Sequence, residues 1–574
     1  MTNPLALVVP LNPSPAKTPQ RLLLAACVLA LSACGTSVPL PQWPASQPAT
    51  APAPQTGAPA PVSTATDTTA STAPISQSRV QALPYSDAVA ALFPEPAQRY
   101  HTPGLASGRS AFTSNAELAA QLQQLPPASS DGLQIAVLSA GSSQNGRPIS
   151  AVLAAQSTDL TPASLDAAGR PTVMIVAGQQ GNAPASTEAV LALLQELQAD
   201  GLLRPMLAHI NLLLVPRANP DGFETGQPTT ASGADLRHDH LRLATPEARV
   251  LARLVGMYRP AVVVDAGEFA ALEPVQTRFG AVRANDMGLQ YAMPANTHEF
   301  IAKAAREWFY QPMASRLTDA GLRVDWLSEP TGNDAAAGFA MDTIAPTTLA
   351  NVAALKNAIG LTVQSRGNDL GLLHAQRRVH GLVQALLAVL DNASARAADL
   401  AKVQTFAARD IAAKACQGSL LVQAQMQQET RNLALVDLAS AQIAPQSVAW
   451  QSALGLTATA QRSRPCGYWL SPEARNTAAQ LDQLGLQVQR VAELTPLVAD
   501  GYLSHGNSAI TTQRALADAP PGSYYVSMNQ GQANLAAALL EPDTPYGSYA
   551  QGVLLDLGHL VRVVTPAPLV FEDE

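Results

Sequence analysis

The chain has 574 residues and a formal net charge of −8, which is long enough for two domains with full hydrophobic cores. The acidic balance excludes a basic nucleic-acid-binding protein, so no nucleic-acid partner is expected. Only 14% of the residues are charged and 47% are hydrophobic. No window approaches the roughly 20 apolar residues of a membrane-spanning helix, which excludes a polytopic membrane protein.

The N-terminus has the pattern of an export signal. Two basic residues precede the apolar run 22–33, which is too short to span a bilayer. The run ends in Ser-Ala-Cys-Gly, which resembles a bacterial lipobox and predicts a lipoprotein signal peptide over 1–33 with lipidation of Cys34. An ordinary signal peptide with an incidental cysteine is the alternative. Because Gly35 is not Asp, we expect a lipid-anchored envelope protein that faces the periplasm, at the outer membrane.

The segment 34–85 that follows is rich in Pro, Ala and Thr. Such a composition cannot bury a core and favours extended, solvated backbone. We therefore predict a disordered tether between the membrane anchor and a folded body.

The chain contains four cysteines. Cys27 would leave with the signal peptide and Cys34 would carry the lipid, so Cys416 and Cys466 remain as a pair in an oxidising compartment. We predict that they form a disulfide, with two buried free thiols as the alternative.

Beyond the tether, apolar runs alternate with amphipathic stretches. Continuous apolar strands separated by helices predict an α/β domain with a mixed, largely parallel sheet and helices on both faces. A Gln-rich stretch with less regular alternation follows and predicts a smaller, β-containing α+β domain. We place the two domains at 86–395 and 396–574. The predicted strands of the first domain are 135–138, 149–154, 171–177, 210–215, 261–264 and 360–363. Its first predicted helix is capped by Ser186 or Thr187 and ends at 201. Two further helices are predicted over 246–258 and 370–390.

In open α/β sheets, ligands bind beyond the carboxyl ends of the strands. Four polar segments follow predicted strands and are expected there: 178–185 (GQQGNAPA), 217–240 (which contains NPDGF and GADLRHDH), 265–270 (DAGEFA) and 364–367 (QSRG).

These segments, in this order, resemble the zinc carboxypeptidase family of carboxypeptidase A-like metallopeptidases. Asn-Pro-Asp-Gly alone is a weak signal because it is also a good turn sequence. The resemblance covers roughly 173–390 and implies a carboxypeptidase-like fold, a catalytic zinc ion and peptide hydrolysis.

The resemblance also identifies residues that depart from the family pattern. The family takes two zinc ligands from His-Gly-x-Glu, where this chain has Gln180 and Ala183, and a third from a His whose position is Gly267. The family's catalytic Glu corresponds to Gln364, which cannot act as a general base at neutral pH. The resemblance therefore implies an inactive catalytic position and no metal at these three positions. We expect no cofactor, with zinc only if the protein is active after all.

The family holds the substrate carboxylate with Asn and Arg in Asp-Leu-Asn-Arg, where this chain reads Asp-Leu-Arg237-His238. Arg237, His238 and Arg366 are our candidate substrate-binding residues. His238 and His240 form the only close histidine pair and could be part of a substitute metal site, although a polar loop pair is the simpler interpretation.

Three functions stay open at this point. The first is a lipid-anchored pseudoenzyme of the zinc carboxypeptidase family that binds a peptide or a cell-wall (murein) stem peptide without hydrolysing it. The second is an active zinc metallocarboxypeptidase or murein peptide amidase. The third is a purely structural envelope protein.

Overall fold

The computed structural model describes residues 84–573 except 126–131, 198–200, 333–336 and 505–509. The predicted signal peptide, Cys34 and all but the last two residues of the predicted tether lie outside the described residues. The described residues belong to one compact unit. Within the described residues, no helix is both long and apolar enough to cross a membrane.

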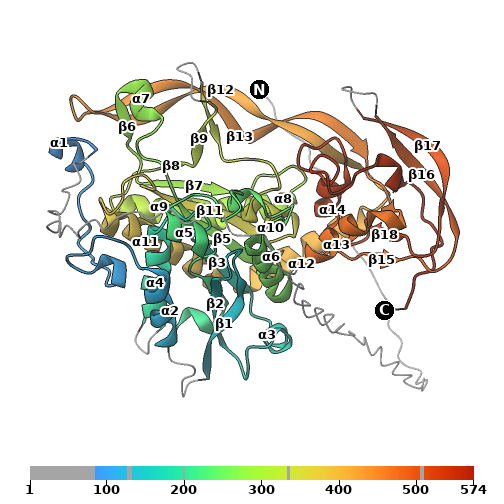
Figure 1. Cartoon of the computed structure of the whole chain (residues 1–574), viewed down its shortest axis with the longest axis horizontal. Helices are drawn as coiled ribbons and strands as arrows, with labels where there is room; N and C mark the ends of the chain where they lie inside the picture. The colour runs from blue at the N-terminus through green and yellow to red at the C-terminus, as the bar shows by residue number, and fades with distance from the viewer. Residues whose placement is uncertain (1–83, 126–131, 198–200, 333–336, 505–509, 574) are drawn as a thin grey trace, which may run out of the picture. The chain divides into compact units, whose positions relative to one another are not determined.

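The core of this unit is a mixed sheet of eight strands (Figure 1). Four central strands run parallel, and every residue of three of them, β3, β4 and β11, is buried. This confirms the predicted mixed α/β fold. In sheet order the strands are β1 (Leu133–Ser142), β2 (Pro148–Gln156), β4 (Asn211–Val215), β3 (Thr172–Ala177), β5 (Val262–Phe269), β11 (Ile359–Arg366), β7 (Met287–Tyr291) and β8 (Val324–Trp326).

Helices cover both faces of this sheet. The side chains of each central strand alternate between the two faces, so both faces are apolar and have to be covered. Ile175 and Val264 pack with one set of helices, whereas Met174 and Val263 pack with the other. The first set contains α4 (Ala185–Gln195), α9 (Gln311–Asp319) and α11 (Ala375–Ala395), and the second contains α6 (Pro246–Tyr258) and α10 (Leu349–Leu355). The other helices that precede α12 are α1 (Asp87–Ala90), α2 (Asn115–Gln123), α3 (Pro162–Ala168), α5 (Pro220–Thr225), α7 (Val275–Phe279) and α8 (Glu299–Ala304).

Helix α4 begins differently from the prediction. We expected Ser186 or Thr187 as its cap, but the helix already begins at Ala185. Both hydroxyls instead donate to loop carbonyls, Ser186 to Ala183 O and Thr187 to Pro216 O. The free amide of Ala185 donates to a carboxylate from β5, which takes over the role of a local cap.

A second sheet is built around a long ribbon, β12 (Ser419–Asp437) paired with β13 (Ile443–Ser463). The ribbon lies along the upper side of Figure 1. Short strands from the preceding region extend it on both sides: β6 (Ala281–Arg283) on one, β10 (Phe339–Met341) and β9 (Ser328–Pro330) on the other. Strands from both sides of the boundary predicted at residue 396 therefore share one sheet.

The C-terminal region adds a third sheet, as the predicted β-containing domain required. Helix α12 (Ala397–Ala413) leads into the ribbon, and Cys416 and Cys466 form the predicted disulfide at its base, with Cα atoms 4.2 Å apart. The six strands, in sheet order, are β15 (Gln489–Arg490), β18 (Tyr524–Ser527), β14 (Gly467–Leu470), β19 (Leu560–Val563), β16 (Thr495–Leu503) and β17 (Thr511–Ala519); the helices are α13 (Arg475–Gln483) and α14 (Ala533–Leu540).

Candidate functional site

The four predicted segments lie at the carboxyl ends of β3, β4, β5 and β11. Two of them are not loops, because 265–269 and 364–366 are the last residues of the strands β5 and β11 themselves. Gly267 lies directly beside Gln364 in the register of the parallel strands. A Cβ atom added to Gly267 would lie 3.6 Å from Gln364 Nε2, which is ordinary van der Waals contact. The side chain of Gln364 therefore packs over the glycine that occupies a family ligand position.

The loop after β3 carries the other two ligand positions. Ala183 is buried, and its amide donates to Gln180 O in a tight turn. The same loop approaches α5 so closely that a Cβ atom on Gly181 would collide with the backbone of Gly222. The loop is thus fixed against its neighbour.

These positions do not fit a zinc ion. A catalytic zinc site needs three protein ligands, whereas Gln180, Ala183 and Gly267 offer an amide, a methyl group and a hydrogen atom. Within the described residues, no group of three or more His, Cys, Asp or Glu side chains is arranged to hold a metal ion.

Arg237 is buried in the crevice between two carboxylates. Its Nη2 lies 3.0 Å from Asp342 Oδ2, and its Nε lies 3.6 Å from Asp265 Oδ2. Burial lowers the pKa of Arg237, but the surrounding carboxylates, Asp342 and Asp265 foremost and then Glu329 and Asp235, together raise it. For Asp265, burial raises the pKa, against the opposing effect of Arg237. The guanidinium that we predicted to bind substrate is therefore paired within the protein.

The two histidines of the loop have different environments. His240 is buried, and its Nε2 lies 2.5 Å from Gln179 Oε1. Burial, together with the nearby His238 and Arg237, lowers the pKa of His240 to about 3, so the ring is neutral. The side chain of His238 is 40% exposed, and its Nδ1 lies 3.2 Å from Thr347 Oγ1. Of the three predicted substrate-binding residues, only His238 is open to a ligand.

The carboxylate between the two histidines has a structural role. Asp239 accepts hydrogen bonds from the amides of Ala244 and Thr245 and from the Thr245 hydroxyl, at the start of α6. The Asp239 carboxylate is therefore occupied at the start of the helix. It does not form a three-residue metal site with His238 and His240.

Glu268, the residue after Gly267, also has a structural role. Its Oε1 lies 2.5 Å from Arg378 Nη2, and its Oε2 accepts the amide of Ala185 at the start of α4. Both side chains are almost fully buried. This ion pair joins β5, α4 and α11 behind the crevice.

Arg366 lies in a different cluster from Arg237 and His238. It is buried, and its guanidinium carbon lies 3.7 Å from the centre of the Phe93 ring, which indicates a cation–π contact. Burial lowers its pKa. The three predicted substrate-binding residues therefore do not form one group.

Two other polar residues, Asn219 and Asp221, hold the loops in shape. Asn219 donates from Nδ2 to Gln179 O and to Thr229 O, and it accepts the amide of Gly222. Asp221 accepts from Arg147 in the turn between β1 and β2.

Sequence reasoning missed three residues that shape this region: Gln179, Asp342 and Phe93. Gln179 is adjacent to a family ligand position, so its place in the loop was the available signal. Asp342 and Phe93 lie far away in the chain and carry no motif, so only the tertiary structure reveals them.

The comparisons with known proteins find the same family that the loop sequences resemble. The model of the zinc carboxypeptidase family matches residues 128–242. Over this segment the chain is similar to the zinc carboxypeptidase family. It is similar to carboxypeptidase 2 of Trichophyton rubrum and of Trichophyton tonsurans, in each case 24% identical over 403 residues, which are 65% of this chain and 72% of the relative.

A solved structure, carboxypeptidase A from Helicoverpa armigera, matches with a TM-score of 0.37 and 14% identity. The match covers 50% of this chain and 75% of that protein. A likeness at this level does not by itself assign the fold.

The match to the family model corrects our expectation about the cofactor. We expected none, with zinc only for an active enzyme. That expectation is wrong for this family, because the matching family model describes zinc carboxypeptidases and the relatives are carboxypeptidases. In this chain, however, Gln180, Ala183 and Gly267 do not provide the zinc ligands that the family has at these three positions.

Proposed function

We propose that this protein binds a peptide in the crevice and does not hydrolyse it by the zinc mechanism of its family. The observation that carries the proposal is Gln364 packed over Gly267, because these positions hold the general base and one zinc ligand in the family. An amide cannot accept a proton from water at neutral pH. The exposed side chain of His238 beside these positions supports ligand binding.

The ligand class that we propose is a peptide, including the stem peptide of murein. The proposal rests on the similarity to zinc carboxypeptidases, because carboxypeptidases bind the end of a peptide chain. Since Arg237 is shared between Asp265 and Asp342, we propose that His238 makes the polar contact with the ligand.

The test uses the full-length protein purified from an envelope fraction. Its zinc content is measured, release of C-terminal residues from a peptide panel is assayed, and peptide binding is followed by the rise in melting temperature. We expect peptide-dependent stabilisation without hydrolysis. His238→Ala should reduce the stabilisation, whereas His209→Ala, at an exposed position outside the crevice, should not.

About one equivalent of zinc per chain together with hydrolysis that a chelator abolishes would replace our proposal with the active enzyme, a metallocarboxypeptidase or murein peptide amidase. The absence of any peptide-dependent shift would instead favour a purely structural envelope protein.

We further propose that the protein is anchored to the periplasmic side of the outer membrane through lipid on Cys34. The support is the lipobox-like sequence and the composition of the segment 34–85. Labelling of growing cells with a radioactive fatty acid should mark the wild type and not Cys34→Ser, and the variant should leave the membrane fraction. Equal labelling of both would contradict the anchor.

A further inference from the structure

A groove separate from the crevice lies between the ribbon and the loop that follows α14. Its volume is about 620 Å³. We call it the ribbon groove. It is lined by one wall from the preceding region (Ala295 and 343–345), a floor from the ribbon (423–425 and Thr459) and a second wall from the loop 542–546 with Tyr549 and Ala550.

The ribbon groove shares a wall with the crevice. Asp342, the partner of Arg237, directly precedes Thr343, and Thr347, which contacts His238, follows two residues after Ala345. Asn351 holds the segment between them, because its Nδ2 donates to both Thr343 O and Ala345 O at 2.8 Å. One fixed segment therefore faces the crevice on one side and the ribbon groove on the other.

The floor of the groove is the irregular part of the ribbon. The register between β12 and β13 shifts on both sides of Gln423, so that Gln423 pairs with Ala460 but Ala424 pairs with Ala458. Thr459 is thus an extra residue in a β-bulge. Bulges redirect side chains and are frequent beside functional sites.

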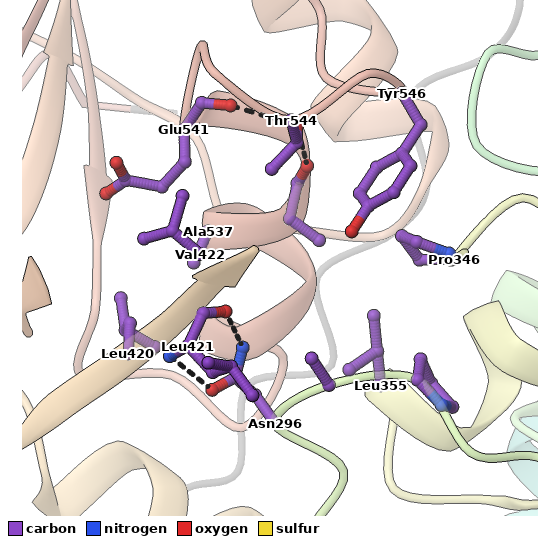
Figure 2. A pocket seen from close by; sticks show the side chains of 13 residues that line it. Asn296, Pro346, Leu355, Leu420, Leu421, Val422, Ala537, Glu541, Thr544 and Tyr546 are labelled. Atoms are coloured by element: carbon purple, nitrogen blue, oxygen red, sulfur yellow. Dashed lines mark hydrogen bonds between the residues drawn. The ribbon is translucent and has the colours of Figure 1, made fainter. Parts of the chain in front are cut away.

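A small pocket continues the groove at its inner end. Its volume is about 20 Å³, which is room for one water molecule. Figure 2 shows the Tyr546 side chain directed into this pocket, while the Glu541 carboxylate points away from it. That carboxylate instead accepts hydrogen bonds from Tyr468 and Arg562. Asn296 closes the pocket by bonding both the amide and the carbonyl of Leu421 (Figure 2).

The side chains that line the groove offer no unpaired charge. Asp543 is the only ionisable acid or base in it apart from the tyrosines, and its carboxylate oxygens lie 2.6 and 2.8 Å from Arg462 nitrogens. What remains for a ligand is the amide of Gln425, the hydroxyl of Thr459 and two tyrosine rings. Tyr549 is half-buried and lines the groove.

We propose that the ribbon groove binds an uncharged oligosaccharide. Hydroxyl and acetamido groups of sugars hydrogen-bond to amide and hydroxyl side chains such as those of Gln425 and Thr459, and the apolar face of a pyranose ring packs on an aromatic ring such as that of Tyr549. A charged ligand has no counter-ion here, because Asp543 is already paired with Arg462. This site is independent of the proposed function of the crevice.

The test measures binding of chitotetraose, maltotetraose and tetra-alanine to the full-length protein by isothermal titration calorimetry. We expect an oligosaccharide to bind and tetra-alanine not to bind. Tyr549→Ala should weaken sugar binding about tenfold, since it removes the stacking surface. Tyr549→Phe should retain it, and Gln425→Ala should weaken it.

Matched controls are Gln446→Ala, at a position outside the groove on the same ribbon, and Tyr258→Ala, at a half-buried tyrosine on α6. Both should bind as the wild type does. The proposal is overturned if neither oligosaccharide binds at millimolar concentration, if Tyr549→Ala and Gln425→Ala leave the affinity unchanged, or if tetra-alanine binds more tightly than the sugars, which would make the groove a peptide site.

Discussion

Arg237 illustrates how a single side chain changes the chemistry of the crevice. In the family pattern this position carries the Asn of Asp-Leu-Asn-Arg, which helps to hold a substrate carboxylate. Here a guanidinium takes its place and is shared between Asp265 and Asp342, both buried. A cation that already neutralises two carboxylates offers little attraction to a third. An arginine at this position indicated anion binding, but Asp265 and Asp342 already occupy the guanidinium of Arg237.

The first prediction follows from this pairing. Arg237→Met should destabilise the fold by roughly 3–5 kcal/mol, because it leaves the carboxylates of Asp265 and Asp342 buried and unpaired. Unfolding in urea measures the change. The control is Arg99→Met, which removes an exposed ion pair with Glu95 and should cost less than about 1 kcal/mol. A small effect for Arg237→Met would show that the crevice is open to water in solution.

The second prediction concerns pH and His240. Its folded-state pKa is about 3, below the ordinary value of 6.5. Between these two values the unfolded chain binds a proton that the folded chain excludes, so stability is complete above about pH 6.5 and is lost as the pH falls. Each pH unit in this window weakens the fold by up to about 1.4 kcal/mol from this group.

The measurement is the difference in unfolding free energy between the wild type and His240→Gln from pH 4 to pH 7. The variant should lose less stability on acidification, whereas His209→Gln, at an exposed histidine, should follow the wild type. Parallel pH profiles for all three proteins would contradict a neutral, buried His240.

Among the secondary-structure elements, the central strands and α6 were predictable because each carries its own periodic signal. The helix predicted over 246–258 is α6 with the same bounds, since a Thr cap, a Pro in the first turn and an apolar stripe agree. The helix predicted over 370–390 instead begins at Ala375, after a residue in the left-handed region, His374. Local pattern therefore located this helix but not its first turn.

The ribbon was not predictable in this way. Most of its side chains are exposed or half-buried, and its apolar residues alternate with Gln, Thr and Ser in an interrupted pattern. Its register also shifts, which breaks the period of two that marks a strand. Pairing with the short strands β6 and β10 stabilises it, and that pairing is invisible in a local window.

The third prediction concerns the base of the ribbon. The disulfide joins residues 50 positions apart in the sequence and encloses both ribbon strands. In the chain-entropy model, closing a loop of this length stabilises the fold by roughly 4 kcal/mol. Cys416→Ser with Cys466→Ser should therefore lower the unfolding free energy by about that amount. The reduced wild type is the control and should match the variant; equal stability of the oxidised and reduced proteins would contradict the prediction.

For the whole molecule, the sequence was sufficient to place the four loops at one edge of the sheet, because parallel strands end together. Gly267 and Gln364 are indeed neighbours in register, although 97 residues separate them in the chain. The sequence did not reveal Asp342, which directly follows β10 and pairs with Arg237. A family motif identifies which positions to inspect, whereas the ion pairs that determine their chemistry come from parts of the chain without a motif.

The last prediction tests whether the geometry of the family site persists in this chain. Gln180→His, Ala183→Glu and Gly267→His together restore the three ligands. The Gly267 position can accept a Cβ atom, since the nearest atoms would lie 3.6–3.8 Å away in Gln364. A histidine ring beyond that Cβ then requires Gln364 to move aside. We therefore expect zinc to raise the melting temperature of the triple variant more than that of the wild type, and Gln364→Glu in addition to supply the missing general base.

The wild type and the single variant Gln364→Glu are the controls for this experiment. An equal zinc-dependent shift in the wild type and the triple variant would mean that the native chain already binds the metal elsewhere. No shift in any protein would mean that the loop carrying Gln180 and Ala183, fixed by the contact of Gly181 with Gly222, has moved out of the family geometry. Because the loop and the two strands come from separate parts of the chain, recovery of a three-ligand site is a test of the whole fold.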